Sequence, residues 1–254
     1  MKYVIGNWKM NLGIRESIAM ARVALRSLQG KEDVPVVVIC PSATALSEVR
    51  KVVARTRIEL GSQNIGPGKA GAYTGELGGT QLQDVGVTYA IIGHSERRQA
   101  GEDEAILPKR FAAAFEVGIT PVLCVGEPAE IRAGSASAQY VREQVRRALK
   151  GVAVPRGKRF LVAYEPIFAI GTGTSASVPH TLEIIEHITA VLLELGFDDV
   201  PVLYGGSVNA QNVYSYLREP QISGVLVGSA SVQPQEFPGI VASACDVMSA
   251  QKDI

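Results

Sequence analysis

The sequence predicts an α/β fold, a closed eight-stranded parallel (β/α)8 barrel in which residues 1–254 form a single domain. Three observations lead to this prediction. Eight short apolar runs recur along the chain, segments with helical spacing lie between them, and no linker or low-complexity stretch divides the 254 residues. Eight alternating strand and helix units close into a barrel of about 250 residues.

The eight apolar runs have the character of strands buried on both faces. They are short, rich in β-branched residues and apolar almost throughout, rather than alternating between apolar and polar. Strands of a parallel sheet that is covered by helices have this pattern. The runs are residues 3–7, 35–40, 57–62, 87–92, 119–124, 159–164, 200–204 and 223–227.

The segments between these runs repeat apolar residues at helical spacing. Helices are predicted over residues 16–28, 44–54, 105–117, 137–149 and 180–195. In the first of them, the side chains expected to face the core are Ile18, Ala21, Val23, Leu25 and Leu28. Connections of this kind are right-handed crossovers between parallel neighbouring strands.

An open, doubly wound sheet would show the same alternation. Such sheets commonly bind their ligand at a glycine-rich turn after the first strand. Here the first strand runs into residues 6–11, GNWKMN, which contain no GxGxxG pattern. We therefore favour the barrel, in which functional side chains follow the carboxyl ends of the strands.

Composition excludes several function classes. Lysine plus arginine and aspartate plus glutamate number 25 each, so no net charge attracts nucleic acid or an anionic membrane. Cys40, Cys124 and Cys245 are odd in number and lack CxxC spacing, which argues against a disulfide framework or a thiolate metal site. No apolar run approaches the roughly 20 residues that span a bilayer. We expect a cytoplasmic protein without nucleic-acid or membrane partners.

Polar side chains stand at the predicted strand ends. Asn7 and Lys9 follow the first strand, and Lys9 is either a cation for an anionic substrate, a Schiff-base nucleophile or a solvated lysine. His94 ends the fourth strand, where Ser95 can cap a helical turn. A helix N-terminus disfavours a charged imidazole, so a neutral donor is expected, with a buried core histidine as the alternative.

The remaining histidines, His180 and His187, fall in a predicted helix, where we expect ordinary surface or boundary residues. Glu165, by contrast, is the only carboxylate in residues 159–168. Burial among apolar neighbours is expected to raise its pKa toward that of a general base. A structural pairing with Lys9 or Arg97 is the alternative. The glycines of residues 171–173 favour a catalytic role, because they suggest a lid that excludes water.

Two glycine-containing turns, residues 204–208 and 227–231, each follow a strand and are expected to precede a helix. Backbone N–H groups in such turns can bind an anion, and barrels often bind phosphate after strands seven and eight. Each turn alone could be an ordinary tight turn. The pair at the expected strands favours a phosphate site.

Together these motifs resemble the triosephosphate isomerase family over essentially the whole chain. The matching stretches are GNWKMN (6–11), GAYTGE (71–76), GHSERR (93–98), CVGE (124–127), AYEPIFAIGTG (163–173), YGGSV (204–208) and LVGSAS (226–231). The resemblance implies a TIM barrel that interconverts dihydroxyacetone phosphate and glyceraldehyde 3-phosphate through an enediolate, in glycolysis and gluconeogenesis. It implies no cofactor and no metal.

The resemblance also implies roles for individual residues. Glu165 moves a proton between neighbouring carbons, and neutral His94 polarises the carbonyl group, as is known for this family. Lys9 and Asn7 stabilise the developing negative charge, while Ser95 and Glu96 orient the cluster. The residues implied to bind the substrate and its phosphate are Asn7, Lys9, Gly171, Ser207, Gly228 and Ser229.

A lid and a homodimer follow from the same resemblance. The lid comprises Pro166, Ile167, Phe168, Ala169, Ile170, Gly171, Thr172 and Gly173. Thr74, in a long glycine-rich connection, matches the residue that reaches the lysine and asparagine of a partner subunit's site. The sequence departs from the family pattern at Phe168, commonly tryptophan, and at Thr174, Ser223 and Ser229.

Two other functions are compatible with this chain. One is a Schiff-base aldolase barrel with Lys9 as the nucleophile. The other is a non-catalytic phosphosugar-binding or scaffold protein that keeps the fold. Retention of Asn7, Lys9, His94 and Glu165 favours the isomerase over both.

Overall fold

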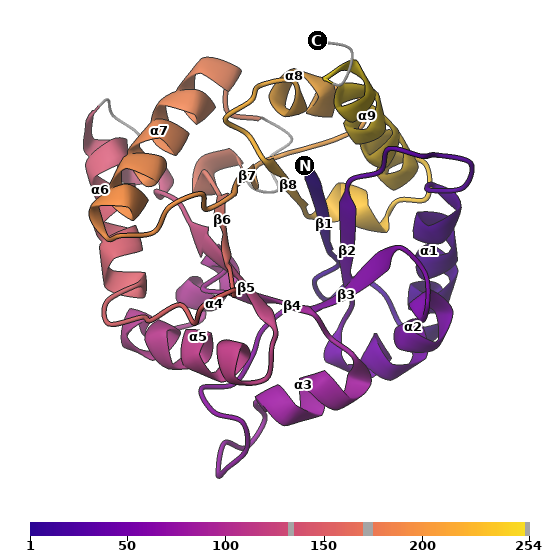
Figure 1. Cartoon of the computed structure of the whole chain (residues 1–254), viewed down its shortest axis with the longest axis horizontal. Coiled ribbons are helices and arrows are strands. Elements are labelled where there is room, and N and C mark those ends of the chain that lie inside the picture. The colour runs from indigo at the N-terminus through magenta and orange to yellow at the C-terminus, as the bar shows by residue number, and fades with distance from the viewer. Residues whose placement is uncertain (132–134, 170–174, 252–254) are drawn as a thin grey trace.

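In the computed structural model, eight parallel strands close into a barrel in chain order, from β1 to β8 and back to β1. Figure 1 looks down this barrel, with the helices as an outer ring. The structure describes residues 1–131, 135–169 and 175–251. The strands are β1 (Tyr3–Asn7), β2 (Val36–Cys40), β3 (Ile58–Ser62), β4 (Tyr89–Ile92), β5 (Thr120–Val125), β6 (Leu161–Tyr164), β7 (Val202–Tyr204) and β8 (Gly224–Val227). The predicted closed barrel is confirmed, and the open sheet is excluded.

The helices of the ring include the five predicted ones, each shifted by one or two residues at its ends. They are α1 (Ile14–Arg26), α2 (Leu46–Val53), α3 (Gly79–Val85), α4 (Ser95–Gln99), α5 (Leu107–Glu116), α6 (Ser135–Ala148), α7 (Val178–Glu194), α8 (Val213–Leu217) and α9 (Glu236–Ala250). The inner face predicted for the first helix is partly wrong. The side chains that α1 buries are Ser17, Met20, Ala21 and Ala24, whereas Ile18 is only partly buried. Val23 and Leu25 pack partly buried against the core, and Leu28, beyond the end of α1, is buried as predicted.

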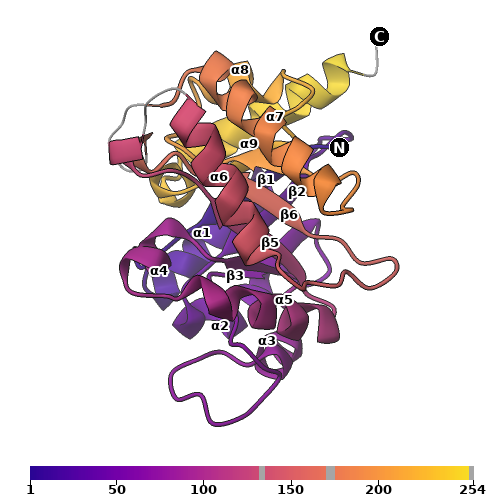
Figure 2. The same cartoon turned by 90° about the vertical axis from the view of Figure 1, so that its left-hand side faces the viewer.

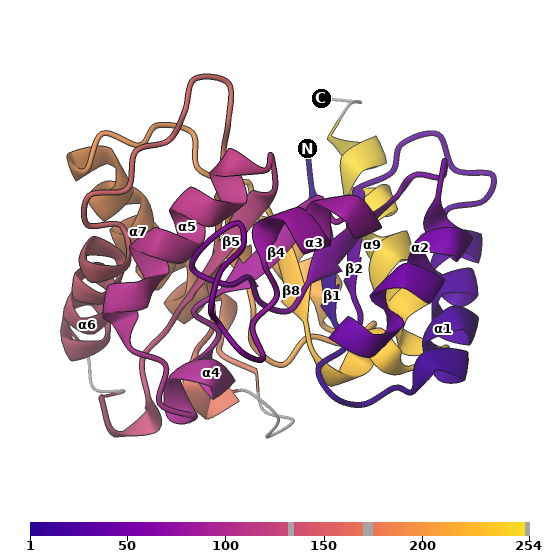
Figure 3. The same cartoon turned by 90° about the horizontal axis from the view of Figure 1, so that it is seen from below.

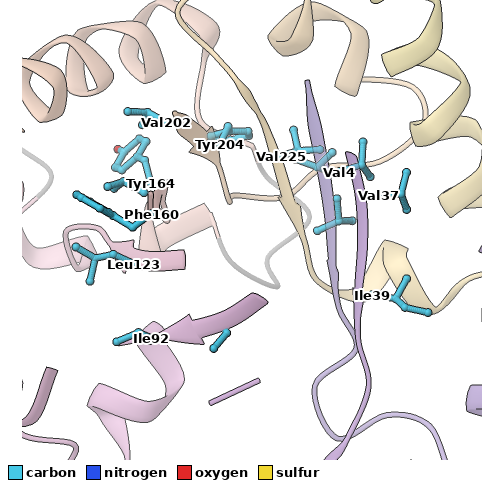
Figure 4. Packing of buried hydrophobic residues seen from close by; sticks show 14 of the residues in the cluster. Val4, Val37, Ile39, Ile92, Leu123, Phe160, Tyr164, Val202, Tyr204 and Val225 are labelled. Carbon is cyan, nitrogen blue, oxygen red and sulfur yellow. The ribbon is translucent and has the colours of Figure 1, made fainter. Parts of the chain in front are cut away.

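Apolar side chains form two layers, one inside the barrel and one between barrel and helices. Alternate residues of a strand point to opposite sides, so Ile5 of β1 lies in the inner layer and Val4 in the outer one. Figure 4 shows part of the outer layer, with Phe160, Tyr164 and Tyr204 among its larger side chains. Both layers are fully buried at these positions, which explains why the strands are apolar on both faces.

All strands run the same way, so their carboxyl ends share one rim. In Figure 3 the N-terminus, at the start of β1, lies at the upper edge, while α4, which follows β4, lies at the lower edge. The connection between β3 and α3, residues 63–78, stands out from the barrel in Figures 1 and 2. Among the described residues, no helix is both long and apolar enough to cross a membrane.

The seam between β8 and β1 closes the barrel and depends on Gly224. Tyr3 pairs with Gly224 and Gly6 with Val227 in a parallel register. A Cβ atom on Gly224 would lie 2.2 Å from the carbonyl oxygen of Tyr3 and 2.7 Å from its nitrogen. Any larger residue would therefore push the two backbones apart.

We expect Gly224→Ala to lower the free energy of unfolding by about 3 kcal/mol, since a backbone cannot yield as a side chain can. Urea unfolding followed by circular dichroism measures this. Gly13→Ala is the control, because a Cβ there meets only a Glu16 carboxylate oxygen at 3.5 Å, and an alanine N-cap costs about 1 kcal/mol or less. Equal stability losses in the two variants would contradict the proposed role of the seam.

Candidate active site

A cavity of about 540 Å³ opens at the carboxyl ends of the strands. Asn7 and Lys9 reach it from β1, His94 from β4 and Glu165 from β6. Of these side chains, Asn7, His94 and Glu165 are at most 5% exposed, so they are largely shielded from water. The structure thus brings together the four polar residues that the sequence placed at separate strand ends.

His94 and Glu165 contact each other directly. The Nε2 atom of His94 lies 3.0 Å from Oε1 of Glu165, and the backbone N–H of Ser95 donates to Oε2 at 3.3 Å. On the other side of the ring, Nδ1 accepts a hydrogen bond from the backbone N–H of Glu96 at 3.2 Å. The first turn of α4 therefore orients both the imidazole and the carboxylate.

The expected rise in the pKa of Glu165 is wrong for this arrangement. Burial does raise the pKa of Glu165, but the charge of His94, its hydrogen bond and the Ser95 N–H outweigh burial and lower the pKa. These contacts all stabilise the carboxylate form. The sequence shows that Glu165 lies among apolar residues, but it does not show which groups donate hydrogen bonds to the carboxylate.

The pKa of His94 does not follow the expectation that the helix N-terminus disfavours the charged imidazole. Burial lowers the pKa of His94, but the charge and hydrogen bond of Glu165 raise it more, so the pKa lies above its ordinary value. The N–H of Glu96 at Nδ1 opposes this, because it favours a ring that carries its proton on Nε2 alone. The protonation of His94 therefore depends on whether Glu165 stays beside it as a carboxylate.

Lys9 adopts a strained backbone conformation, with φ of 51°. This left-handed region costs a residue other than glycine about 1 kcal/mol or more. The Oδ1 atom of Asn7 accepts from the Lys9 N–H at 3.2 Å, and Gln63 donates to the Lys9 carbonyl at 2.7 Å. The ammonium pairs with Oε1 of Glu96 at 2.6 Å. The strain places Lys9 in the cavity, and nothing in the sequence revealed it.

The turn after β7 offers unpaired backbone donors. The N–H groups of Gly206 and Ser207 have no hydrogen-bond partner among the described residues. Glycine is required here because a Cβ on Gly206 would lie 2.3 Å from the Tyr204 hydroxyl. As expected, a helix follows this turn, since α8 begins at Val213.

The turn after β8 matches its prediction more closely. A 3-10 helix, Ser229–Val232, starts directly after Gly228, and both Gly228 and Ser229 line the same cavity as Ser207. The first N–H groups of a helical turn have no partner within it and are available to an anion. The cavity that holds the His94–Glu165 pair is therefore also lined by backbone donors of these two turns.

The predicted lid is described only over Pro166–Ala169. Ile167–Ala169 form a 3-10 turn, and the Ser207 hydroxyl donates to the carbonyl oxygen of Ala169. The predicted lid and phosphate residues Ile170, Gly171, Thr172 and Gly173, and also Thr174, lie outside the described residues. The entry of the lid is therefore tied to the turn after β7.

Sequence reasoning missed the residues that hold the far side of this segment. The Tyr204 hydroxyl accepts from the N–H of Ala176 at 3.0 Å, and the Tyr216 hydroxyl donates to the Ala176 carbonyl. The two tyrosine rings stack, with centroids 4.2 Å apart. Both tyrosines are buried among apolar residues, so no sequence pattern indicates that their hydroxyl groups form hydrogen bonds.

Cys124 also lies beside Glu165. Burial, followed by the charge of Glu165, raises the pKa of the Cys124 thiol well above its ordinary value, so it stays a neutral thiol rather than a nucleophile. Within the described ranges, no three histidine, cysteine or acidic side chains are arranged to hold a metal ion. The reactive groups of the cavity are thus the carboxylate, the imidazole and the ammonium.

A second cavity, of about 470 Å³, adjoins the first and shares Asn7, Lys9 and His94 with it. Its remaining walls come from residues 41–46, from residues 63–77, which include Thr74, and from Glu96 and Arg97. Thr74 is exposed at the tip of its loop. Lys9 can therefore be reached from two sides.

Comparison with known proteins gives one consistent result. A family model described as triosephosphate isomerase matches residues 2–244. Triosephosphate isomerase of Mycobacteroides abscessus is 40% identical, with 95% of each chain covered. That of Aquifex aeolicus is 38% identical, covering 95% of this chain and 99% of its own. The crystal structure of triosephosphate isomerase from Bartonella henselae superposes with a TM-score of 0.83 at 29% identity, covering 98% of this chain and 99% of that one.

The His94–Glu165 pair predicts how stability changes with pH. The lowered pKa of Glu165 contributes stability above about 4.3, its unfolded value, and that contribution is lost as the pH falls through the lower folded value. The raised pKa of His94 contributes stability below about 6.5, and that contribution is lost as the pH rises through the higher folded value. The pair therefore stabilises the fold most between these two values.

We expect the excess stability of the wild type over His94→Gln to be larger at about pH 5.5 than at about pH 9. Urea unfolding of both proteins across this range measures the difference. His187→Gln, on α7, serves as a control for removal of a histidine outside the cavity. A difference between wild type and His94→Gln that does not change with pH would contradict the pairing.

Proposed function

The chain belongs to the triosephosphate isomerase family, and on this basis we propose that it interconverts dihydroxyacetone phosphate and glyceraldehyde 3-phosphate by proton transfer. The reaction serves glycolysis and gluconeogenesis. The observation that supports this most directly is the shared cavity, where a buried carboxylate, an imidazole and an ammonium meet backbone N–H groups that have no partner among the described residues. These groups suit a small phosphorylated substrate that exchanges a proton.

Glu165 is the proposed base. It removes a proton from the carbon beside the carbonyl group, which leaves a negative charge on the carbonyl oxygen of the intermediate. It then returns the proton to the neighbouring carbon, while His94 passes the hydroxyl proton from one oxygen to the other, so that the carbonyl group changes place. One carboxylate can serve both carbons because they are adjacent. At 3% exposure, Glu165 is shielded from water that would compete for the proton.

His94 is the proposed electrophile. In the structure its Nε2–H donates toward Glu165. In the reaction this N–H would donate to the substrate carbonyl oxygen instead. Once Glu165 has taken up the proton, its negative charge no longer raises the pKa of His94. Burial and the Glu96 N–H at Nδ1 then both favour a neutral ring. The neutral imidazole is an established feature of this family.

Lys9 and Asn7 are proposed to stabilise the charge of the intermediate. A lysine ammonium has three donors, of which the ion pair with Glu96 uses one. An ammonium in an ion pair is a poor nucleophile, which disfavours the Schiff-base aldolase. Ser95 and Glu96 orient the cluster through the hydrogen bonds to Glu165, His94 and Lys9.

The phosphate is proposed to bind at the two turns. Ser207, Gly228 and Ser229 line that side of the cavity, and the N–H groups of Gly206 and Ser207 are unpaired. The lid beginning at Pro166 would cover the substrate, with Gly171 as a further phosphate donor. Pro166 fixes its own φ and gives the lid a stiff entry.

A homodimer is proposed as the working form. The loop carrying Thr74 stands out from the barrel, and a cavity beside Lys9 and Asn7 is open to receive a second copy of it. We further propose that the whole chain acts as one domain in the cytoplasm. Nothing in its balanced charge suits a nucleic-acid partner.

We expect purified protein to isomerise both triose phosphates and Glu165→Gln to lose about 100- to 10,000-fold in kcat, because an amide cannot accept the proton. A coupled assay in each direction measures this. Glu48→Gln, a surface carboxylate on α2, should match the wild type. Equal turnover by wild type and Glu165→Gln would remove Glu165 as the base, and binding without turnover would favour a scaffold protein.

We expect wild-type protein to sediment as a dimer and Thr74→Arg to sediment as a monomer with greatly reduced turnover, since a bulky cation would enter the cavity beside Lys9. Sedimentation velocity with parallel activity measurements checks this. Ser249→Arg, exposed on α9, is the control. A fully active monomeric wild type would contradict the dimer.

A further inference from the structure

Glu127 lies beneath the entry of the lid and is 0% exposed. Its Oε1 atom accepts a hydrogen bond from the Tyr164 hydroxyl at 3.0 Å. Its Oε2 atom has no hydrogen-bond partner in the part of the chain that the structure describes. A buried carboxyl group with an unpaired oxygen is costly unless a positive charge or a further donor lies close by.

His180 is the only basic side chain within 4.0 Å of Glu127 among the described residues. Its Nε2 atom lies 3.5 Å from Oε1 of Glu127 and 3.3 Å from the Tyr164 hydroxyl. Because that hydroxyl donates to Glu127, it can accept from the Nε2–H of His180. The three side chains therefore form one hydrogen-bonded cluster, the 127–164–180 cluster.

The 127–164–180 cluster contacts the chain on both sides of Glu165, the proposed base. Tyr164 directly precedes Glu165, and the N–H of Ile167 donates to the Glu127 carbonyl at 3.1 Å. The N–H of Glu165 donates to the carbonyl of Val125 at 2.7 Å. A Cβ on Gly126 would lie 1.8 Å from the Glu165 carbonyl, so the two segments are in backbone contact. Any shift of Glu127 would be passed to Glu165.

The position of His180 is fixed from two further directions. It lies in the first turn of α7, where its backbone N–H donates to the Ser177 hydroxyl at 3.4 Å. Its ring lies 6.3 Å from the ring of Phe168, between centroids, and its Nδ1 atom is 3.8 Å from Glu183. His180 thus joins α7 to the β6 end and to the lid entry. His180 is partly exposed, as expected of a boundary residue, and it also contacts the buried Glu127.

We propose that His180 is a positioning residue for Glu165, acting through Tyr164 and Glu127. Its Nε2–H donates to the Tyr164 hydroxyl, which in turn donates to the buried Glu127, and this chain of hydrogen bonds holds residues 164–167 where the base can reach the substrate carbon. This inference rests on the proposed isomerase function. It adds a residue that touches neither substrate nor base.

The test compares His180→Ala with His180→Gln, which keeps a side-chain N–H donor. We expect His180→Ala to lower kcat about tenfold, as when a buried acceptor loses its donor, with KM changed less than about twofold. A substrate deuterated at the carbon that loses its proton should show a larger isotope effect in this variant. His180→Gln should recover most of kcat. His187→Ala, on the same helix, should match the wild type.

Hydrogen exchange at the Ile167 amide gives a readout that needs no turnover, and it should be faster in His180→Ala only. An unchanged kcat in His180→Ala would overturn the inference while leaving the isomerase function intact. An equal loss of kcat in both His180 variants would also overturn it, because a donor would then not be what matters. A wild type without isomerase activity would overturn the proposed function and this inference together.

Discussion

The closure of β8 onto β1 is the constraint on which the site depends. Asn7 and Lys9 come from the start of the chain, whereas Glu165, Ser207 and Gly228 lie far along it. They share one cavity only because the parallel register from Tyr3–Gly224 to Gly6–Val227 completes the ring. Parallel strands place all their carboxyl ends on one rim, so closure of the barrel brings every reactive group to the same rim. This closure requires glycine at position 224, because there is no space for a side chain between β8 and β1.

Within the rim, Glu165 is held as a paired carboxylate. His94 and the Ser95 N–H lower the pKa of Glu165, and Glu165 in turn raises the pKa of His94. This contact stabilises the protein. In the proposed reaction the substrate oxygen accepts from His94 in place of Glu165, so that burial then raises the pKa of Glu165 and lowers that of His94. The same two residues thus contribute to stability through their contact and to the chemistry once the substrate separates them.

Much of this could be predicted from the sequence, because buried parallel strands are apolar throughout and the functional residues follow their ends. Asn7, Lys9, His94 and Glu165 were all found in this way. The pKa directions of Glu165 and His94 were not, since they depend on a 3.0 Å contact between residues of different strands. The strained φ of Lys9, the tyrosine contacts at Ala176 and the pairing of His180 with Glu127 were also missed. Each depends on three-dimensional neighbours that no local pattern encodes.

The central claim is that a proton, rather than a hydride, moves between the two carbons by way of Glu165. Running the isomerisation in deuterium oxide and recording the product by nuclear magnetic resonance tests this most directly. A proton held on a carboxyl group exchanges with solvent, so part of the product should carry deuterium on the carbon that receives it. A product that keeps the substrate hydrogen entirely, with no deuterium on that carbon, would contradict the account.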